Sequence, residues 1–176
     1  MTAPRYMPLI AYAEAWTPSI PGVVDGPVVY LGDAGAEEIE AMLPSLRGAI
    51  VLTHGPQTAF RDEDRPQPGL SDEPIRTGNP PGIPTIAATP NRVMRELLQR
   101  AGAGVTLRPS AYRDGTVGVL GSRGTGDDAV PSIMVAAEQY NMLARLARGG
   151  AAPELRVELR VRYDEEAQGS WRGDRR

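Results

Sequence analysis

The sequence has few of the side chains that enzymes use to hold metal ions or to act as nucleophiles. It contains no cysteine and one histidine, His54, in 176 residues. A catalytic zinc ion commonly has three protein ligands, most often with more than one imidazole or thiolate among them. A cysteine nucleophile is excluded outright. We therefore interpret the chain first as a binding or accessory module, and an enzyme hypothesis must overcome this shortage.

Other features that the sequence lacks limit the classes of partner it could bind. Lysine is missing, so all 19 basic residues are arginine, and 22 acidic residues give a net charge of −3. Without a net positive charge to attract phosphates, we expect no nucleic-acid partner. No apolar run approaches the roughly 18–20 residues of a membrane span, and the N-terminus lacks the apolar stretch of a secretory signal. We expect no membrane partner, and a chain without cysteine fits either redox compartment, so its location stays open.

Composition favours a fold of short elements. Aromatic residues make up only 5% of the chain, so the core must be largely aliphatic, and 20 glycines and 17 prolines favour frequent turns. The order of apolar runs predicts an α/β (α+β) domain, with a mixed β-sheet or open barrel-like β core and two main flanking helices. Strands are expected at 28–31, 46–53, 85–88, 105–107, 116–120, 131–135 and 155–163. Helices are expected at 37–43, from the N-cap Thr89 to Gly102, and at 137–148.

The chain divides into three parts by composition. Residues 1–22 are an irregular lead-in, for which Tyr12 and Trp16 are the expected anchors. Residues 23–166 form the domain, with a long proline-rich loop at 55–90 in which missing N–H donors prevent regular structure. Residues 167–176 are a polar tail.

His54 is a candidate site residue because it ends an apolar strand and precedes Gly55-Pro56. Strand ends beside loops often present catalytic groups, and one hypothesis is a small hydrolase in which His54 works with a carboxylate from the following loop. The simpler interpretation is a turn histidine held by a backbone contact.

The remaining candidates lie in the acidic part of that loop. Carboxylates flanked by arginines could bind a hard cation such as calcium, but the spacing is not that of an EF-hand loop. A solvated, self-paired surface is the simpler interpretation, and it applies equally to 127–128 and 164–166. We expect no metal site, and name as a candidate interaction surface His54, Arg61, Asp62, Asp64 and Arg65.

The other motifs do not predict a catalytic or cofactor-binding site. Residues 121–126 are glycine-rich but have neither the dinucleotide spacing nor the Walker ending. There is no Gly-x-Ser-x-Gly elbow, and Ser110, Ser122 and Ser132 have only His54 as a conceivable base. The Arg-Gly-Asp at 172–174 is interpreted as a coincidence in an arginine-rich chain. We therefore predict no catalytic and no cofactor-binding residue.

Several stretches resemble a known family in their order along the chain. They are Gly26-Pro-Val-Val-Tyr-Leu-Gly32, Leu46-Arg-Gly-Ala-Ile-Val-Leu52, the helix from Arg92 followed by Ala-Gly-Ala-Gly-Val105, Ala129-Val-Pro-Ser-Ile-Met-Val135, and the final Val-Glu-Leu-Arg-Val strand. Together they resemble the protease-associated (PA) domain carried by zinc-dependent exopeptidases of the aminopeptidase and glutamate-carboxypeptidase type. The likeness covers about residues 23–166, and the 55–90 segment is longer and richer in proline than the family's usual link.

This resemblance implies a noncatalytic accessory domain that shapes substrate access or mediates protein association. Its partners would be the catalytic domain of a parent peptidase and a peptide or protein substrate. Zinc would belong to the parent enzyme and not to this chain, and the parent would be secreted or periplasmic. Two alternatives stay open: the stand-alone hydrolase using His54, and a structural swivelling domain that only positions its neighbours.

Overall fold

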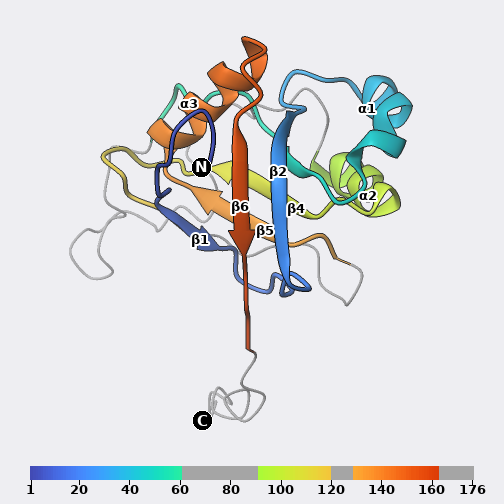
Figure 1. Ribbon diagram of the computed structural model, residues 1–176, viewed down its shortest axis with the longest axis horizontal. Helices are drawn as coiled ribbons and strands as arrows, with labels where there is room; N and C mark the ends of the chain where they lie inside the picture. Colours follow the sequence, from blue (N-terminus) through green and yellow to red (C-terminus); the bar gives the residue numbers. More distant parts are fainter. Residues whose placement is uncertain (61–90, 120–128, 163–176) are drawn as a thin grey trace, which may run out of the picture.

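A computed structural model describes residues 1–60, 91–119 and 129–162. Within these residues six strands form one sheet in the order β1-β5-β4-β3-β2-β6 (Figure 1). The strands are β1 (Ala11–Ala13), β2 (Val23–Tyr30), β3 (Ile50–Leu52), β4 (Val105–Pro109), β5 (Ser132–Val135) and β6 (Glu154–Glu158). The helices are α1 (Ala36–Met42), the 3-10 turn η1 (Leu43–Leu46), α2 (Asn91–Ala101) and α3 (Ala137–Arg148).

The sheet is mixed, and this confirms the predicted fold class. The four inner strands β2, β3, β4 and β5 run parallel, whereas β1 pairs antiparallel with β5 and β6 antiparallel with β2. Inner strands of a parallel sheet are covered on both faces, so most of their residues are apolar. All three residues of β3 and all four of β5 are buried.

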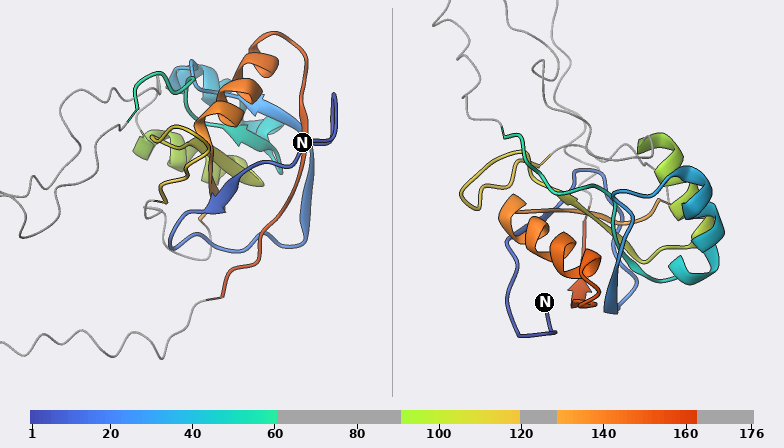
Figure 2. Two further views of the ribbon diagram at one scale, coloured as in Figure 1. Left: turned by 90° about the vertical axis from the view of Figure 1, so that its left-hand side faces the viewer. Right: turned by 90° about the horizontal axis from the view of Figure 1, so that it is seen from above.

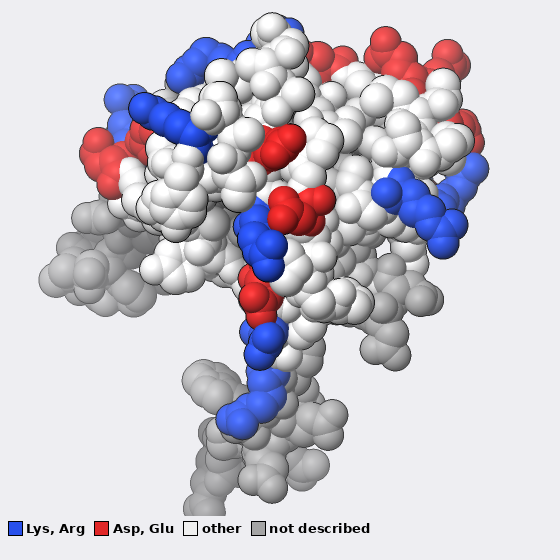
Figure 3. All heavy atoms as spheres, in the orientation of Figure 1, with Lys and Arg blue, Asp and Glu red and all other residues white. Residues whose placement is uncertain are grey.

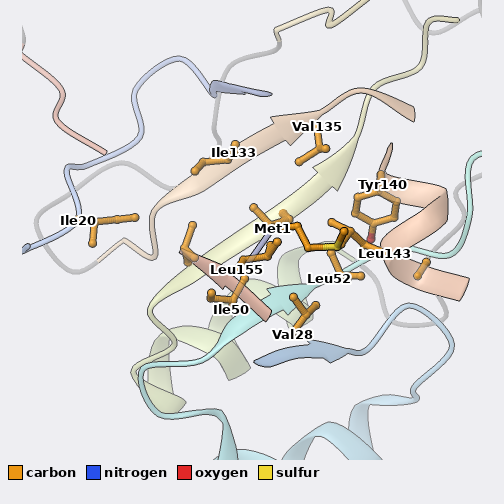
Figure 4. Close-up of a cluster of buried hydrophobic side chains, with 13 residues drawn as sticks. Met1, Ile20, Val28, Ile50, Leu52, Ile133, Val135, Tyr140, Leu143 and Leu155 are labelled. Carbon is orange, nitrogen blue, oxygen red and sulfur yellow. The ribbon is translucent and has the colours of Figure 1, made fainter. Parts of the chain in front are cut away.

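Helices cover both faces of the sheet (Figure 2). On one face, α3 contributes Tyr140, Leu143 and Ala144 to a cluster with side chains from the strands, drawn in Figure 4. On the other face, α1, η1 and α2 pack against β2 and β3 in a second cluster. Apolar residues at spacings of three and four explain both contacts, because they lie on one side of each helix.

Glycines end two of the helices as the sequence predicts. Gly102 follows α2 with a φ of +69°, and Gly150 follows α3 with a φ of +77°. After α3, the N–H of Ala151 donates to the carbonyl of Leu146 at 2.9 Å. A left-handed residue lets the chain turn back and satisfy the last carbonyls of the helix.

The lead-in is more ordered than predicted, and its anchors are different. Residues 11–13 form the edge strand β1, while Met1 and Ile20 are buried in the α3-side cluster. Tyr12 and Trp16 are 60% and 56% exposed, so the prediction that they anchor this segment was wrong. Aliphatic side chains fill the space under α3, and the rings are left outside.

Three strand predictions need correction. The strand expected at 46–53 forms only at Ile50–Leu52, and Leu46 belongs to η1 instead. Residues 116–119, part of the expected strand 116–120, are not in a strand, because the carbonyl of Thr116 accepts from the Ser110 hydroxyl at 2.8 Å within a loop. The last strand ends at Glu158 and not at residue 163. The expected strand 85–88 and the N-cap Thr89 lie outside the described residues. None of the helices described is long and apolar enough to cross a membrane.

Candidate functional site

Polar residues gather where the parallel strands end. In open sheets with parallel strands, ligands bind beside the carboxyl ends of the strands, because loops from several strands meet there. His54 lies two residues after β3, and the first turn of α3 lies beside it. We call this group of residues the strand-end cluster: Thr53, His54, Gln57, Tyr140 and Asn141.

The His54 imidazole is held by its neighbour in sequence. His54 is only 8% exposed, and its Nδ1 lies 2.8 Å from Oγ1 of Thr53. The same hydroxyl donates to the carbonyl of Leu107 on β4 at 3.3 Å. Because a hydroxyl has one proton to donate, this arrangement is satisfied when Nδ1 carries the imidazole proton and donates to Thr53.

The His54 backbone is fixed by a single phenol. The hydroxyl of Tyr140 donates to the His54 carbonyl at 2.6 Å and accepts from the His54 N–H at 2.9 Å. Tyr140 is fully buried, and Figure 4 shows its ring beside Leu143 on α3, near Leu52 at the end of β3. Burial raises the pKa of this phenol far above its ordinary value, so it stays neutral at physiological pH. One side chain thus satisfies both backbone polar groups of a buried residue.

Three contacts fix the segment that follows His54. The Gln57 N–H donates to Oδ1 of Asn141 at 2.6 Å, and Nδ2 of Asn141 donates to the Gln57 carbonyl at 2.8 Å. This reciprocal pair imitates a backbone ladder with one side chain. Farther along, the guanidinium of Arg113 lies 4.7 Å from the centre of the Phe60 ring. Residues 54–60 are therefore tied at intervals to α3 and to the loop after β4.

Gly32 allows the strand-end cluster to sit close to β2. A Cβ atom at Gly32 would overlap the backbone carbonyl of His54 and the backbone nitrogen of Gly55. Glycine is needed at such a position because two backbones approach closer than any side chain permits. The chain after β2 therefore determines where His54 lies.

Stability is expected to fall as the pH rises above about 10. The unfolded Tyr140 phenol ionises near its ordinary pKa of 10.0, whereas burial keeps the folded phenol protonated. Its stabilising contribution is complete below the unfolded pKa and is lost as the pH rises toward the folded one. Burial and the hydrogen bond to Asp33 likewise raise the pKa of Tyr30, to about 12, with the same sign. Urea unfolding between about pH 9 and pH 11 measures how steeply the free energy of unfolding falls with pH. The fall should be shallower in Tyr140→Phe. It would be the same in both proteins if Tyr140 did not contribute.

The hydroxyls of Ser110 and Tyr140 are occupied in structural contacts. Oγ of Ser110 donates to the Thr116 carbonyl and accepts from the N–H groups of Tyr112 and Gly118, at 3.2 and 3.3 Å. Both hydrogen-bonding roles of the Tyr140 hydroxyl are taken by His54. These contacts organise loops and give neither hydroxyl the partner that a nucleophile requires.

The other residues of the predicted interaction surface lie outside the described residues, namely Arg61, Asp62, Asp64 and Arg65. Their assembly with His54, and the pairing of His54 with a loop carboxylate, therefore stay predictions. The same holds for Ser122 and for residues 127–128, 164–166 and 172–174. Within the part of the chain that is described, no three His, Asp or Glu residues are grouped closely enough to hold a metal ion.

Sequence reasoning missed Tyr140 and Asn141 as members of this site. Both lie in the helix predicted at 137–148, where Tyr140 belongs to the buried stripe. The available signal was polarity within that stripe, since a buried phenol must find a hydrogen-bond partner. The partner lies 86 residues earlier in the chain.

A shallow groove lies at the opposite ends of the parallel strands from the strand-end cluster. Its volume is about 320 Å³, and it lies where the chain enters β2, β4 and β5. Its lining includes Pro18, Ile20, Val24, Gly102, Gly104 and Pro131. These side chains are aliphatic or absent, and the lining also includes Ser19 and Gln99, so the groove is uncharged but partly polar.

Charges on the face that carries β2 and β6 are mixed in sign (Figure 3). Arg156 pairs with Asp25 at 3.3 Å, and Arg160 pairs with Glu158 at 2.6 Å. Exposed pairs of this kind contribute little to stability. They leave this face without an extended patch of one sign.

Solved structures with a similar fold are peptidases. No family model matches the sequence, and no curated protein matches it. The chain is similar to an aminopeptidase from Aneurinibacillus sp. strain AM-1, with a TM-score of 0.50, 17% identity, and coverage of 85% of this chain and 27% of that chain. It is also similar to a peptidase M28 precursor from Shewanella amazonensis SB2B, with a TM-score of 0.52, 13% identity, and coverage of 90% and 32%.

At these identities the likeness concerns the fold alone. The chain spans about a quarter to a third of each of these peptidase chains. Its fold therefore corresponds to a part of a larger peptidase, as the sequence resemblance implies for its architecture.

Proposed function

We propose that this chain is a noncatalytic accessory domain of the protease-associated type, belonging to a zinc-dependent exopeptidase. The observation that carries the proposal is that most of this chain matches only a minor part of two peptidase structures. The order of the family-like stretches along the sequence supports it independently. In this proposal the zinc ligands and the reacting groups belong to a catalytic domain outside these 176 residues.

The strand-end cluster supports a role in shaping access to a neighbouring active site. Tyr140 and Asn141 attach residues 54 and 57 to α3, so the segment beginning at Arg61 starts from a fixed point. Loops that carry recognition work from rigid supports of this kind. Arginine and carboxylate side chains at 61–65 would then meet polypeptide termini or a partner surface through charge-assisted hydrogen bonds.

The purified chain is expected to fold and to show no aminopeptidase turnover with added zinc. The assay uses chromogenic aminoacyl anilides with zinc and with a chelator, and a di-zinc aminopeptidase as positive control. Zinc-dependent turnover that survives further purification would refute the accessory role.

A His54→Ala variant separates the accessory role from the hydrolase hypothesis. If any hydrolysis of peptides or esters is detected, a base at His54 predicts that its rate falls by roughly a hundredfold or more. The accessory role predicts that neither protein hydrolyses these substrates. Circular dichroism of both proteins checks that the variant remains folded.

A further inference from the structure

Strand β1 has an outer edge to which no other described strand pairs. It is the outermost strand on its side of the described sheet. Natural edge strands are usually protected against a further strand by charges, prolines, bulges or very short length. β1 has the short length, three residues, but lacks the other devices. Residues 9–13 contain neither a charge nor a proline. The opposite edge strand, β6, has exposed charged residues at Glu154, Arg156 and Glu158.

The charged residue that follows β1 in the sequence is turned inward. Glu14 follows β1, its side chain is 2% exposed, and its Oε1 accepts from Nη1 of Arg108 at 2.9 Å. The ion pair lies on the sheet face and leaves the outer edge uncharged. The edge therefore offers its backbone without an electrostatic barrier.

The hydrogen-bond pattern shows which backbone groups face outward. The N–H of Ala136 donates to the Ile10 carbonyl at 2.9 Å, and the N–H of Glu14 donates to the Ser132 carbonyl at 3.0 Å. In an antiparallel ladder, alternate residues bond to the neighbouring strand and those between point away. Tyr12 is therefore paired with β5, while the N–H and C=O groups of Ala11 and Ala13 point away from the sheet.

Side chains beside this edge favour polypeptide over a small ligand. Ala11 and Ala13 are too small to shield their own backbone, and between them Tyr12 is 60% exposed. Ile10 is 47% exposed on the same face as Tyr12. A strand added here would place alternate side chains against this phenol ring, and such cross-strand aromatic contacts stabilise pairing.

We propose that the outer edge of β1 binds an extended peptide by strand addition, through the backbone groups of Ala11 and Ala13. This inference rests on the proposed function in one respect, since it supplies the place where an accessory domain would hold polypeptide. A second copy of the chain is the weaker occupant, because two three-residue edges fall far short of the roughly 1,000 Å² that a stable interface buries. Short peptides bind in this way through a few backbone hydrogen bonds.

The test compares two peptides on the full chain. The first is a short blocked peptide of alternating valine and threonine, and the second carries N-methyl groups on the edge that would face β1. Trp16, which is 56% exposed near the end of β1, reports binding by fluorescence in a Trp171→Phe background. We expect the first peptide to bind at least about tenfold more tightly, since N-methylation removes two backbone donors.

Substitutions at Ala13 provide the matching test on the protein. Ala13→Pro removes an outward N–H and retains the inward bonds of Tyr12 and Glu14, and proline is tolerated at such edge positions. It should weaken binding at least about tenfold at a similar melting temperature, whereas Ala13→Ser, which retains the N–H, should bind like the original chain. If Ala13→Pro fails to fold, the two peptides still decide the question on the unaltered edge.

Three results would overturn the inference. They are no detectable binding, equal binding of the two peptides, and concentration-dependent dimerisation that Ala13→Pro abolishes. The last outcome would assign the edge to a second copy, as measured by light scattering. None of them bears on zinc-dependent turnover, so failure here is distinguishable from failure of the accessory role.

Discussion

Replacing Gly32 with alanine is expected to lower the free energy of unfolding by about 3 kcal/mol. The new Cβ would overlap the backbone of His54 and Gly55, and backbone atoms cannot move aside as a flexible side chain can. Relief of the overlap requires a shift of residues 54 and 55, which disturbs the hydrogen bonds to Tyr140. Urea denaturation followed by circular dichroism measures the loss.

Gly35→Ala is the matched control for this substitution. Gly35 lies three residues later, has a φ of −73°, and a Cβ there would meet nothing closer than Oε2 of Glu38 at 3.8 Å. Alanine fits this conformation, so we expect a change of less than about 1 kcal/mol. Equal effects of the two substitutions would contradict the role of Gly32 as a site of close backbone approach.

Tyr140→Phe is expected to cost about 2–3 kcal/mol although it removes one oxygen atom. The substitution leaves the N–H and the C=O of His54 buried without the partner they share, and each such group costs about 1–3 kcal/mol. The ring still fills its place in the core, so the loss reports the hydrogen bonds and not a cavity. Chemical denaturation gives the energy, and the NMR signal of the His54 amide reports the change in its environment.

Tyr30→Phe is the control for the phenol. The Tyr30 hydroxyl donates to Oδ1 of Asp33 at 2.9 Å in an exposed position, where water can replace it. We expect a loss of less than about 1 kcal/mol. If the two substitutions lowered the free energy of unfolding equally, the hydrogen bonds of Tyr140 to the His54 backbone would not explain the effect.

The sequence predicted most inner elements because their signals are local. Apolar runs place β3, β4 and β5 near their observed positions, and helical spacing with terminal glycines places α2 and α3. β1 was missed because three residues give no periodicity. The first half of β2 was missed because Gly26-Pro27 is typical of a turn, although an edge pairing with β6 accommodates it.

The candidate site was predictable only in part. The position of His54 at a strand end follows from the apolar run that precedes it. Its contact with Tyr140 joins residues far apart in sequence and depends on how α3 lies across the sheet, which no local pattern encodes. The expected strand at 116–120 failed for a related reason, since the side chain of Ser110 binds that segment as a loop.

The two edge strands of the described sheet, β1 and β6, are short and come from opposite ends of the chain. Loss of residues 11–13 would uncover the neighbouring strand. The strand then uncovered, β5, is Ser-Ile-Met-Val, longer than β1 and equally without charge. Such a truncation is expected to promote aggregation, because the exposed edge of β5 would pair with other chains more readily than the shorter edge of β1.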